Sequence, residues 1–330
     1  MKILVTGAAG FIGMHVCIKL LKNNFTVFGI DNLNSYYSVE LKKKRILEIE
    51  KLKKNFVFKK IDLLHKVKLK KIIEKEKFEV IINLAAQAGV RFSIKEPKAY
   101  LDSNVNGFLN LLENSKDLGL KHLIFASSSS VYGLNKDTSY SETSITDNPI
   151  SMYAVTKKSN ELMAFTYSHL YDIPSTGVRF FTVYGPWGRP DMALSIFTKS
   201  ILNKKPIFLH NNGNMLRDFT FVDDIVESVL RLVKKPPVVE HNNIKGPPFR
   251  ILNIGNGSSI PLKKYIECIE KAVGVKAIIE FKSHQMGEVI STLADTKELE
   301  ALINFKPNVS VEKGIKSFVS WYKSYHKITN

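Results

Sequence analysis

The chain has 330 residues, of which 44% are hydrophobic and 24% charged; this is an ordinary globular composition and argues against wholesale disorder. Its two cysteines, Cys17 and Cys268, are too few for a disulfide framework and show no metal-ligand spacing, so no metal and a reducing, cytoplasmic setting are expected. The formal net charge is +17, but the lysines are widely spread and neither a nucleic-acid motif nor 18 consecutive apolar residues occur, so no nucleic-acid or membrane partner is expected.

The first half of the chain alternates short apolar runs with helical patterns, which predicts the βαβ units of a parallel sheet. The expected strands cover residues 3–5, 26–30, 56–58, 80–84, 122–126 and 176–180. Helical patterns lie between them, for example at residues 14–21 and 105–112. The lysine-rich stretch 42–77 also carries glutamates and is expected to form solvated helix faces. We therefore predict a doubly wound α/β sheet with helices on both faces.

After about residue 182 the alternation loosens and loops rich in Gly, Pro and Asn appear. Residues 236–248 contain four prolines and a glycine, which predicts a surface loop. Residues 250–254 predict another strand and 261–272 a helix, and the chain is expected to be helical from about residue 294.

Two domains are expected from this change in pattern. The first covers residues 1–182, with part of 220–260 returning to it, and the second is a smaller α/β domain made mainly of residues 183–330. The first would bind a dinucleotide and the second a substrate.

Gly7, Gly10 and Gly13 stand between the first expected strand and the first helix. This spacing allows a tight turn, close approach of a pyrophosphate and close helix packing, with helix N–H groups facing the anion, as in a Rossmann fold. Ordinary turns also collect glycine, so the flanking strand and helix carry the argument. Asp31 ends the second strand, where a carboxylate can accept hydrogen bonds from ribose hydroxyls and repel a 2′-phosphate. NAD is therefore favoured over NADP, with a plain turn aspartate as the alternative.

Weaker signals follow the third and fourth strands. Asp62 could meet the adenine edge, and the small side chains of the run Leu84, Ala85 and Ala86 would let a dinucleotide lie against the backbone. Small residues are also common because they pack well, so these positions are weak individually.

Tyr153 and Lys157 are four residues apart in an expected helix over residues 151–170, so their side chains share one face. An ammonium near a phenol favours the phenolate and lowers the tyrosine pKa, and an oxidised nicotinamide would add positive charge to the same site. The pair alone is common on surface helices. Four consecutive serines at 127–130 follow the fifth strand, at the sheet edge where ligands bind, and one could hydrogen-bond a substrate hydroxyl and relay its proton to Tyr153. A polar loop is the alternative.

Taken together, these motifs resemble the extended short-chain dehydrogenase/reductase family of NAD-dependent epimerases and dehydratases over essentially the whole chain. The segments that carry the resemblance are TGAAGFIG (6–13), GIDNLNSYY (29–37), LAAQAGVRFS (84–93), SSSSVYG (127–133), YAVTK (153–157), RFFTVYGPWGRPDMA (179–193) and RDFTFVDDI (217–225). The second, third and sixth are narrower and resemble the UDP-glucuronate 4-epimerases within this family.

The resemblance implies roles for individual positions. Ser128 and Tyr153 would handle the proton, and Lys157 would tune Tyr153 and hold the nicotinamide ribose. The implied cofactor contacts are Gly7, Gly10, Phe11, Ile12, Gly13, Asp31, Asn32, Asp62, Leu63, Leu84, Ala85, Ala86, Gln87, Asn104, Tyr153 and Lys157. The implied substrate contacts are Arg91, Ser128, Ser129, Thr182, Arg189, His210 and Arg217.

Within that second set, Thr182, Arg189 and Arg91 would meet a sugar carboxylate and Arg217 the UDP pyrophosphate. His210 stands where relatives often carry an aromatic ring against uracil, and residues 285–288 replace a more usual Pro-Gly-Asp stretch.

The implied reaction is epimerisation of UDP-glucuronate to UDP-galacturonate through a 4-keto sugar. Tyr153 would remove the 4-hydroxyl proton while hydride passes to NAD and later returns to the opposite face of the sugar. Tight binding of UDP away from the reacting carbon would retain the intermediate. The resemblance also implies a homodimer that serves surface polysaccharide synthesis.

Two alternatives stay open. A UDP-glucose/UDP-galactose 4-epimerase would have no substrate carboxylate to bind. A non-catalytic NAD-binding sensor would commonly lose Tyr153 or Lys157, which this chain retains. Dehydration is disfavoured because an acidic pair does not follow Ser128.

Overall fold

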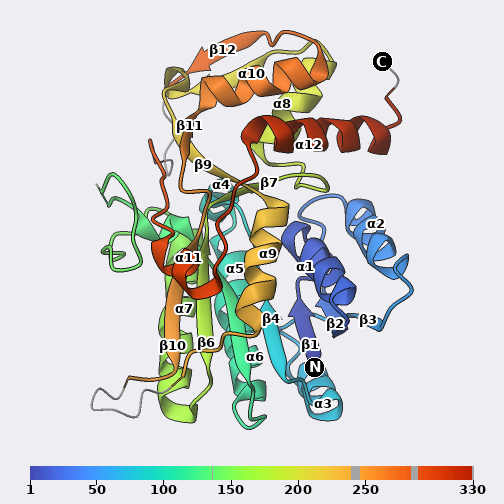
Figure 1. Ribbon diagram of the computed structural model, residues 1–330, viewed down its shortest axis with the longest axis vertical. Coiled ribbons are helices and arrows are strands. Elements are labelled where there is room, and N and C mark those ends of the chain that lie inside the picture. The colour runs from blue at the N-terminus through green and yellow to red at the C-terminus, as the bar shows by residue number, and fades with distance from the viewer. Residues whose placement is uncertain (136, 239–245, 284–288, 329–330) are drawn as a thin grey trace.

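A parallel seven-stranded sheet forms the centre of the computed structural model, which describes residues 1–135, 137–238, 246–283 and 289–328 (Figure 1). Residues 285–288 and the middle of the 236–248 loop lie outside this part of the chain. The strand order is β10-β6-β5-β4-β1-β2-β3. The strands are β1 (Lys2–Thr6), β2 (Thr26–Asp31), β3 (Phe56–Lys60), β4 (Val80–Asn83), β5 (His122–Ser128), β6 (Ser175–Phe180) and β10 (Phe249–Ile254). The predicted doubly wound α/β fold is confirmed.

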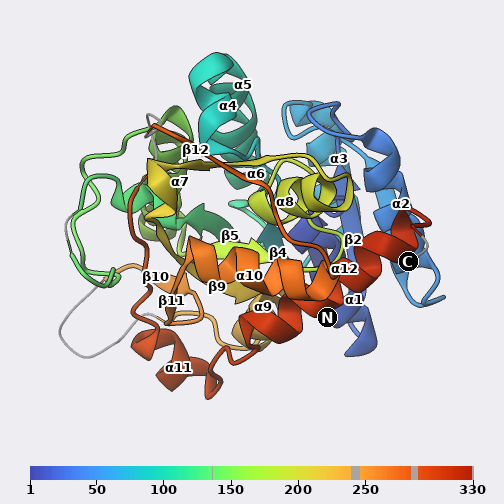
Figure 2. The same cartoon turned by 90° about the horizontal axis from the view of Figure 1, so that it is seen from above.

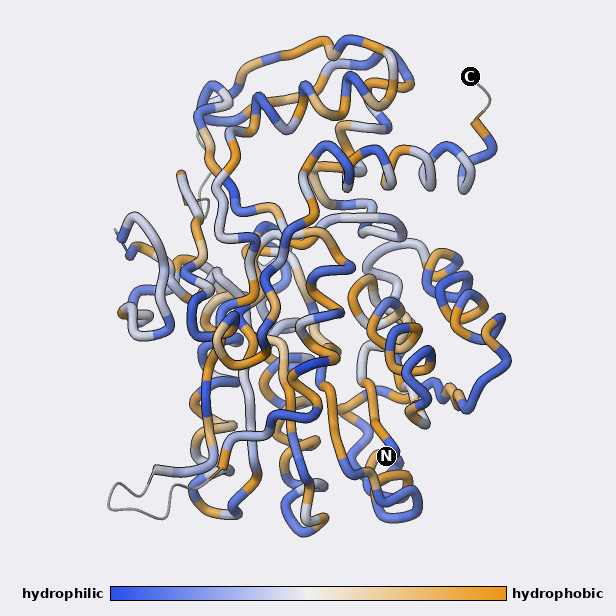
Figure 3. Tube along the Cα trace, in the orientation of Figure 1, coloured by the Kyte–Doolittle hydropathy of each residue, from blue (hydrophilic) through white to orange (hydrophobic). Residues whose placement is uncertain are grey.

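Helices cover both faces of this sheet because successive strand residues point to opposite sides. In β1, Ile3 and Val5 belong to one buried cluster and Leu4 to the other. The first face is covered by α1 (Phe11–Lys22), α2 (Val39–Glu50), α9 (Val222–Val233) and α11 (Lys297–Ile303). The second face is covered by α3 (Lys66–Glu76), α6 (Gly107–Ser115) and α7 (Met152–Tyr171). In Figure 3 the hydrophobic colour follows the central strands, as expected for a sheet buried on both faces.

A smaller group of elements lies beyond the carboxyl ends of the parallel strands (Figures 1 and 2). It contains a three-stranded sheet in the order β11-β9-β7 and a β12-β8 pair. Its strands are β7 (Thr182–Tyr184), β8 (Ile207–His210), β9 (Leu216–Phe221), β11 (Ser259–Pro261) and β12 (Ile279–Lys282). Its helices are α8 (Ala193–Leu202), α10 (Leu262–Val273) and α12 (Val311–Tyr325), which share a second apolar core.

Short elements connect these parts. They are α4 (Val90–Lys95), α5 (Pro97–Tyr100), the π-helical turn η1 (Leu101–Asn106) and the 3₁₀ turns η2 (Ser129–Tyr132) and η3 (Asn211–Gly213). The stretch 220–260 includes α9, which packs on α1, and β10, which pairs with β6. Within the described residues, no helix combines the length and apolar character needed to cross a membrane.

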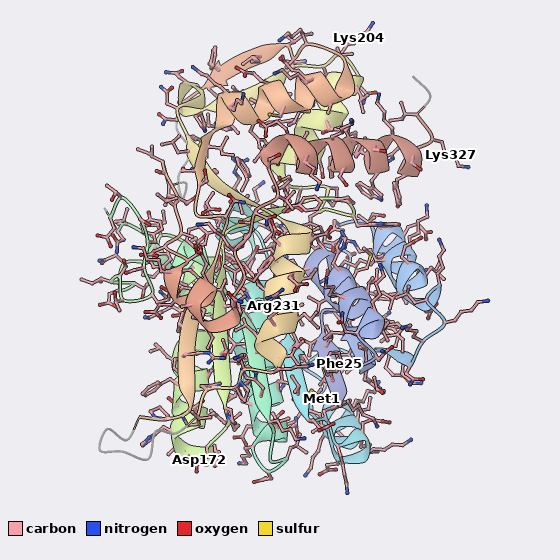
Figure 4. The ribbon with its side chains drawn as sticks, viewed as in Figure 1. Met1, Phe25, Asp172, Lys204, Arg231 and Lys327 are labelled. Atoms are coloured by element: carbon pink, nitrogen blue, oxygen red, sulfur yellow. The ribbon has the colours of Figure 1, made fainter. Side chains whose placement is uncertain are left out.

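One expectation about helices is wrong. Lys42, expected on a solvated face, is only 5% exposed, and its Nζ donates to the Asn34 carbonyl at 2.8 Å and to Oδ1 of Asn34 at 2.7 Å. The expected helical part after residue 294 is present as two helices, α11 and α12, because α11 ends at Ile303 and its C-cap Asn304 has φ +47°. Arg231 of α9 caps this end by donating to the carbonyls of Ile303 at 3.2 Å and Asn304 at 2.9 Å (Figure 4).

Candidate active site

The glycine-rich turn after β1 is built for close approach of backbone to backbone. Gly7 has φ +69°, and a Cβ there would lie 2.7 Å from the backbone nitrogen of Ala85. A Cβ at Gly13 would lie 2.0 Å from the carbonyl oxygen of Gly7. Gly10 forms the N-cap of α1, whose first turn contains no acidic residue. The N–H groups of this helix end are therefore presented at a tight, uncharged turn, which suits a pyrophosphate.

Asp31 lies beside this turn because β2 pairs with β1. Its Oδ2 accepts a hydrogen bond from the Ala9 N–H at 3.2 Å, and its Oδ1 accepts one from the Leu33 N–H at 2.8 Å. Burial raises the pKa of Asp31, and these backbone hydrogen bonds and the charge of Lys42 oppose that rise. A carboxylate fixed in this way fits the ribose of a dinucleotide whose pyrophosphate rests on the glycine turn.

The predicted adenine-side residues follow β2 and β3. Asn32 donates from Nδ2 to Oδ2 of Asp62 at 2.9 Å, and Oδ1 of Asp62 accepts from the N–H of Leu64 at 2.9 Å. The side chain of Leu63 is buried in the core of the second sheet face. These contacts join the loops after two neighbouring strands at one edge of the sheet.

The loop after β4 is tied both to β1 and to the helix that carries Tyr153. The N–H of Ala85 donates to Oγ1 of Thr6 at 3.1 Å. Asn104, in the π-helical turn η1, accepts from the N–H of Gln87 at 2.7 Å and donates to the Gln87 carbonyl at 3.0 Å and to Oγ1 of Thr156 at 3.0 Å. Wide turns of this type are frequent at functional sites. Asn104 thus holds the loop of residues 84–87 against α7.

Ser128, Tyr153 and Lys157 meet at the carboxyl end of β5. Tyr153 is in the first turn of α7, whose N-cap Ser151 accepts a hydrogen bond from the Ala154 N–H. The hydroxyl of Ser128 lies close enough to Tyr153 to affect its pKa, and it accepts a hydrogen bond from Oγ of Ser130 at 3.0 Å. Nζ of Lys157 lies 5.9 Å from the centre of the Tyr153 ring and donates to the Ala126 carbonyl at 2.8 Å.

Burial dominates the ionisation of this group. It raises the pKa of Tyr153, while the hydrogen bond with Ser128 and the charge of Arg189 act in the opposite direction. It also lowers the pKa of Lys157 to about 8. The expected lowering of the tyrosine pKa by Lys157 is therefore not produced by the protein groups alone, because desolvation outweighs their charges. An oxidised nicotinamide, when bound, would add positive charge beside Tyr153 and favour its phenolate.

A small cleft lies between the start of α1 and the second group of elements. Phe11 lines it from α1, Thr182 from β7, and Arg189 from the loop between β7 and α8. The charge of Arg189 acts on Tyr153, so the phenol and the guanidinium lie within electrostatic reach of each other.

The guanidinium of Arg189 forms a bidentate ion pair with the carboxylate of Asp191. Nε of Arg189 donates to Oδ1 of Asp191 at 3.0 Å and Nη2 to Oδ2 at 2.5 Å. The hydroxyl of Tyr36 donates to the same Oδ2 at 2.9 Å. Burial opposes ionisation of Asp191, but the hydrogen bonds and charge of Arg189 hold its pKa below the ordinary value.

Of the predicted substrate residues, Thr182 and Arg189 line the cleft, whereas Ser128, Ser129, Arg91, His210 and Arg217 do not. Arg91 is exposed on α4. His210, at the end of β8, shares a hydrogen bond of 3.0 Å between its Nδ1 and the Ser283 carbonyl. Arg217 of β9 donates to the carbonyls of Val289 at 2.6 Å and Ile290 at 3.0 Å. Ser129, Ile12 and Ala86 lie in segments that border the site, at the start of η2, in the first turn of α1 and after β4.

Sequence reasoning overlooked Tyr36 and Asp191 as site residues. Both stand in the narrow segments 29–37 and 179–193, so the signal was present in the motifs. The hydrogen bond between Tyr36 and Asp191 joins residues 155 positions apart, so the spacing of residues in the sequence could not predict it. No group of three or more His, Cys, Asp or Glu side chains suited to a metal ion occurs in the described part of the chain.

The chain is similar in sequence and in structure to known proteins. The model of the NAD dependent epimerase/dehydratase family matches residues 3–255. The chain is 50% identical over 335 aligned residues to Protein CapI of Staphylococcus aureus, covering 99% of this chain and 100% of that protein. It is 45% identical to a probable UDP-glucuronate 4-epimerase of Rhizobium meliloti (strain 1021), covering 99% and 98% of the two chains. The crystal structure of UDP-glucuronic acid 4-epimerase from Bacillus cereus, in complex with UDP-glucuronic acid and NAD, aligns with TM-score 0.90 at 35% identity, covering 98% and 100%.

Proposed function

The chain belongs to the NAD-dependent epimerase/dehydratase family, and from that membership we propose that it is an isomerase that interconverts UDP-glucuronate and UDP-galacturonate through a 4-keto sugar. NAD, when bound, supplies the acceptor and donor of the C4 hydride. Gly7, Gly10, Gly13 and Asp31 would hold it, because the turn presents the N-terminus of α1 to a pyrophosphate and Asp31 supplies a carboxylate for the ribose.

One observation carries the choice of an acidic sugar. Arg189 lines the cleft next to Thr182, and its charge acts on the phenol of Tyr153. In a uronic acid the carboxylate is attached to C5, the carbon next to the reacting C4. A guanidinium near the tyrosine that handles the C4 hydroxyl is therefore at the position that a uronate requires. A neutral sugar would leave this charge without a partner from the substrate.

Tyr153 would take the proton from the C4 hydroxyl. Ser128, which lies close to Tyr153, would orient the same hydroxyl and relay the proton to Tyr153. Lys157 would hold the nicotinamide ribose from its anchor on the Ala126 carbonyl. When the 4-keto sugar is reduced on its other face, Tyr153 would return the proton. The UDP group, bound by elements of the smaller domain such as the β9 strand with Arg217, would retain the intermediate.

We also propose a homodimer that works in the cytoplasm. Leu109 of α6 is 38% exposed, and Leu162 and Phe165 of α7 are 58% and 47% exposed. These two helices are adjacent, so their apolar side chains form a face suited to a second copy of the chain. Cys17 and Cys268 are both buried and unpaired, which fits a reducing compartment. From the resemblance we also propose that the product serves surface polysaccharide synthesis.

Product analysis tests the function. Purified protein incubated with a panel of UDP-sugars, without added reductant or oxidant, should convert UDP-glucuronate to UDP-galacturonate. Turnover of UDP-glucose alone would contradict the acid specificity and favour the neutral-sugar epimerase. Tyr153→Phe should keep its fold and its NAD affinity while turnover falls by about 10²–10⁴-fold. Full activity of this variant would contradict the proposal. The proposal would also fail if the parent protein bound NAD and UDP-glucuronate but converted no substrate.

A further inference from the structure

Arg45 is a buried cation that the proposed reaction does not use. It lies in α2 and is 0% exposed. Within the described residues it forms no ion pair with a carboxylate. Its charge acts on the carboxylate of Asp31 without direct contact. A charge buried in this way is costly unless hydrogen bonds replace its hydration, so its surroundings need a physical explanation.

The hydrogen bonds of Arg45 go to two separate loops and to the side chain of Tyr37. Nη1 donates to the Ala9 carbonyl at 3.1 Å and to the Tyr37 hydroxyl at 2.6 Å. Nε and Nη2 donate to the Trp187 carbonyl at 3.1 and 2.6 Å, and Nη2 also donates to the Gly188 carbonyl at 3.3 Å. The planar fork of a guanidinium can serve acceptors on several sides at once, which a lysine ammonium on its single flexible stem cannot reproduce.

The first loop is the glycine turn of the cofactor site. The peptide units around Ala9 are held from two sides, because the Ala9 N–H donates to Oδ2 of Asp31 at 3.2 Å while its carbonyl accepts from Arg45. Asp31 and Arg45 therefore fix the same residue of the turn between Gly7 and Gly10.

The second loop leads into Arg189. Trp187 has φ +62°, a conformation that non-glycine residues rarely adopt without support from their surroundings. Its carbonyl is held by Arg45, and its ring packs against Trp321 and Tyr325 of α12, with 5.4 Å between ring centres in each case. The loop is thus anchored on both sides two residues before Arg189.

We propose that Arg45 is a positioning residue that holds the glycine turn and the loop carrying Arg189 in one arrangement. Through these carbonyls it would set the cofactor and the carboxylate-binding guanidinium at a fixed separation across the cleft. This inference rests on the proposed function for its carboxylate part, whereas its cofactor part does not depend on which sugar is accepted.

Arg45→Lys tests the proposal because it keeps the positive charge and removes the fork. With NAD saturating, KM for UDP-glucuronate should rise about tenfold, and the affinity for UDP-glucose, measured as substrate or competitor, should change much less. The NAD dissociation constant of the cofactor-free protein, measured by calorimetric titration, should also rise about tenfold. Lys43→Met is the matched control: this lysine is exposed on the same helix, and neither readout should move.

A double-mutant cycle separates positioning from general stability. If Arg45 acts through Arg189, then Arg45→Lys should not alter the preference for acidic over neutral sugar once Arg189→Ala is in place. Equal losses for both sugars, additive effects, or an unchanged NAD affinity would overturn the proposal. If Arg45→Lys does not fold, Tyr37→Phe removes one acceptor of the fork; a smaller selective loss supports the proposal and an unchanged selectivity and NAD affinity overturn it.

The proposed function and the positioning role fail in different ways. If Arg189→Ala alone affects both sugars equally, the carboxylate assignment of Arg189 is wrong. The NAD affinity of Arg45→Lys then decides the role of Arg45 at the glycine turn. If this variant binds NAD as tightly as the parent protein, that role is rejected.

Discussion

Arg189, which lines the cleft, forms a two-pronged ion pair with Asp191, with 3.0 Å from Nε to Oδ1 and 2.5 Å from Nη2 to Oδ2. The guanidinium that we assign to the substrate carboxylate thus already holds a carboxylate of its own chain. A uronate that binds here must share or displace Asp191, and the strength of this internal pair then sets part of the substrate affinity.

Arg189→Ala should reduce kcat/KM for UDP-glucuronate by roughly 100-fold, because a charge-assisted hydrogen bond to the carboxylate is lost. The binding of UDP-glucose should change by less than about threefold, since it offers no carboxylate. Steady-state kinetics on both sugars measure this, and Arg189→Lys, which keeps the charge, should lose less. Equal losses for the two sugars would mean that Arg189 does not bind the carboxylate.

Asp191→Asn should have the opposite effect on affinity. It removes the negative charge that competes for Arg189 and keeps the side-chain shape, so UDP-glucuronate should bind about 3- to 10-fold more tightly. Asp191→Glu retains the charge and serves as the control. Weaker binding by the asparagine variant, measured by calorimetry, would show that Asp191 chiefly orients Arg189.

Lys157 should make the stability of the cofactor-free protein depend on alkaline pH. Its pKa is lowered by burial to about 8, below the value of 10.5 in the unfolded chain. Between these two values the unfolded state binds the extra proton, so the free energy of unfolding rises with pH; below about pH 8 this contribution is lost. The full effect is of the order of 3 kcal/mol.

Urea unfolding of the parent protein and of Lys157→Met across pH 7–11 checks this expectation, because the difference between the two curves isolates the lysine. The free energy of unfolding of the parent protein should increase relative to that of the variant as the pH increases. A constant difference over this range would show that Lys157 is solvated in the free protein.

The Arg179–Glu161 pair should be critical for stability. Nε and Nη2 of Arg179 donate to the two Glu161 oxygens at 2.8 and 2.9 Å, and Oε1 also accepts from Ser127 Oγ at 2.6 Å. Both side chains are at most 5% exposed. Arg179→Leu leaves a buried carboxylate unpaired and should cost about 3–5 kcal/mol in unfolding free energy. The double variant with Glu161→Leu should recover much of this loss; denaturant titrations that show no recovery would contradict the explanation.

The dimer proposal is tested on the outer face of α7. Leu162→Glu combined with Phe165→Glu places charges in the proposed contact and should convert the protein from dimer to monomer, as measured by light scattering. Val67→Glu alters a residue of α3 that is 67% exposed and should leave the mass unchanged. A parent protein that is already monomeric would refute the proposal directly.

Local patterns were sufficient for the architecture and for much of the candidate site. Runs of alternating or continuous apolar residues predicted every strand of the seven-stranded sheet, because strands buried on both faces leave a strong hydrophobic signal. Gly7, Gly10 and Gly13 were recognisable because a tight turn and close helix packing exclude a Cβ. Tyr153 and Lys157 share a helix, so their common face follows from spacing alone.

The tertiary structure decided which charges are buried and what they contact. Lys42 and Arg45 lie in a lysine-rich helix whose sequence pattern predicts solvent-exposed faces, yet both side chains are buried. Arg45 meets the Trp187 carbonyl 142 residues away, and Tyr36 meets Asp191 across 155 residues. The pKa of Tyr153 is likewise set by desolvation in the assembled site rather than by its helical neighbour. The sequence determined the elements and their local chemistry, because these depend on residues a few positions apart; burial and long-range pairing depend on how the elements pack, which spacing does not encode.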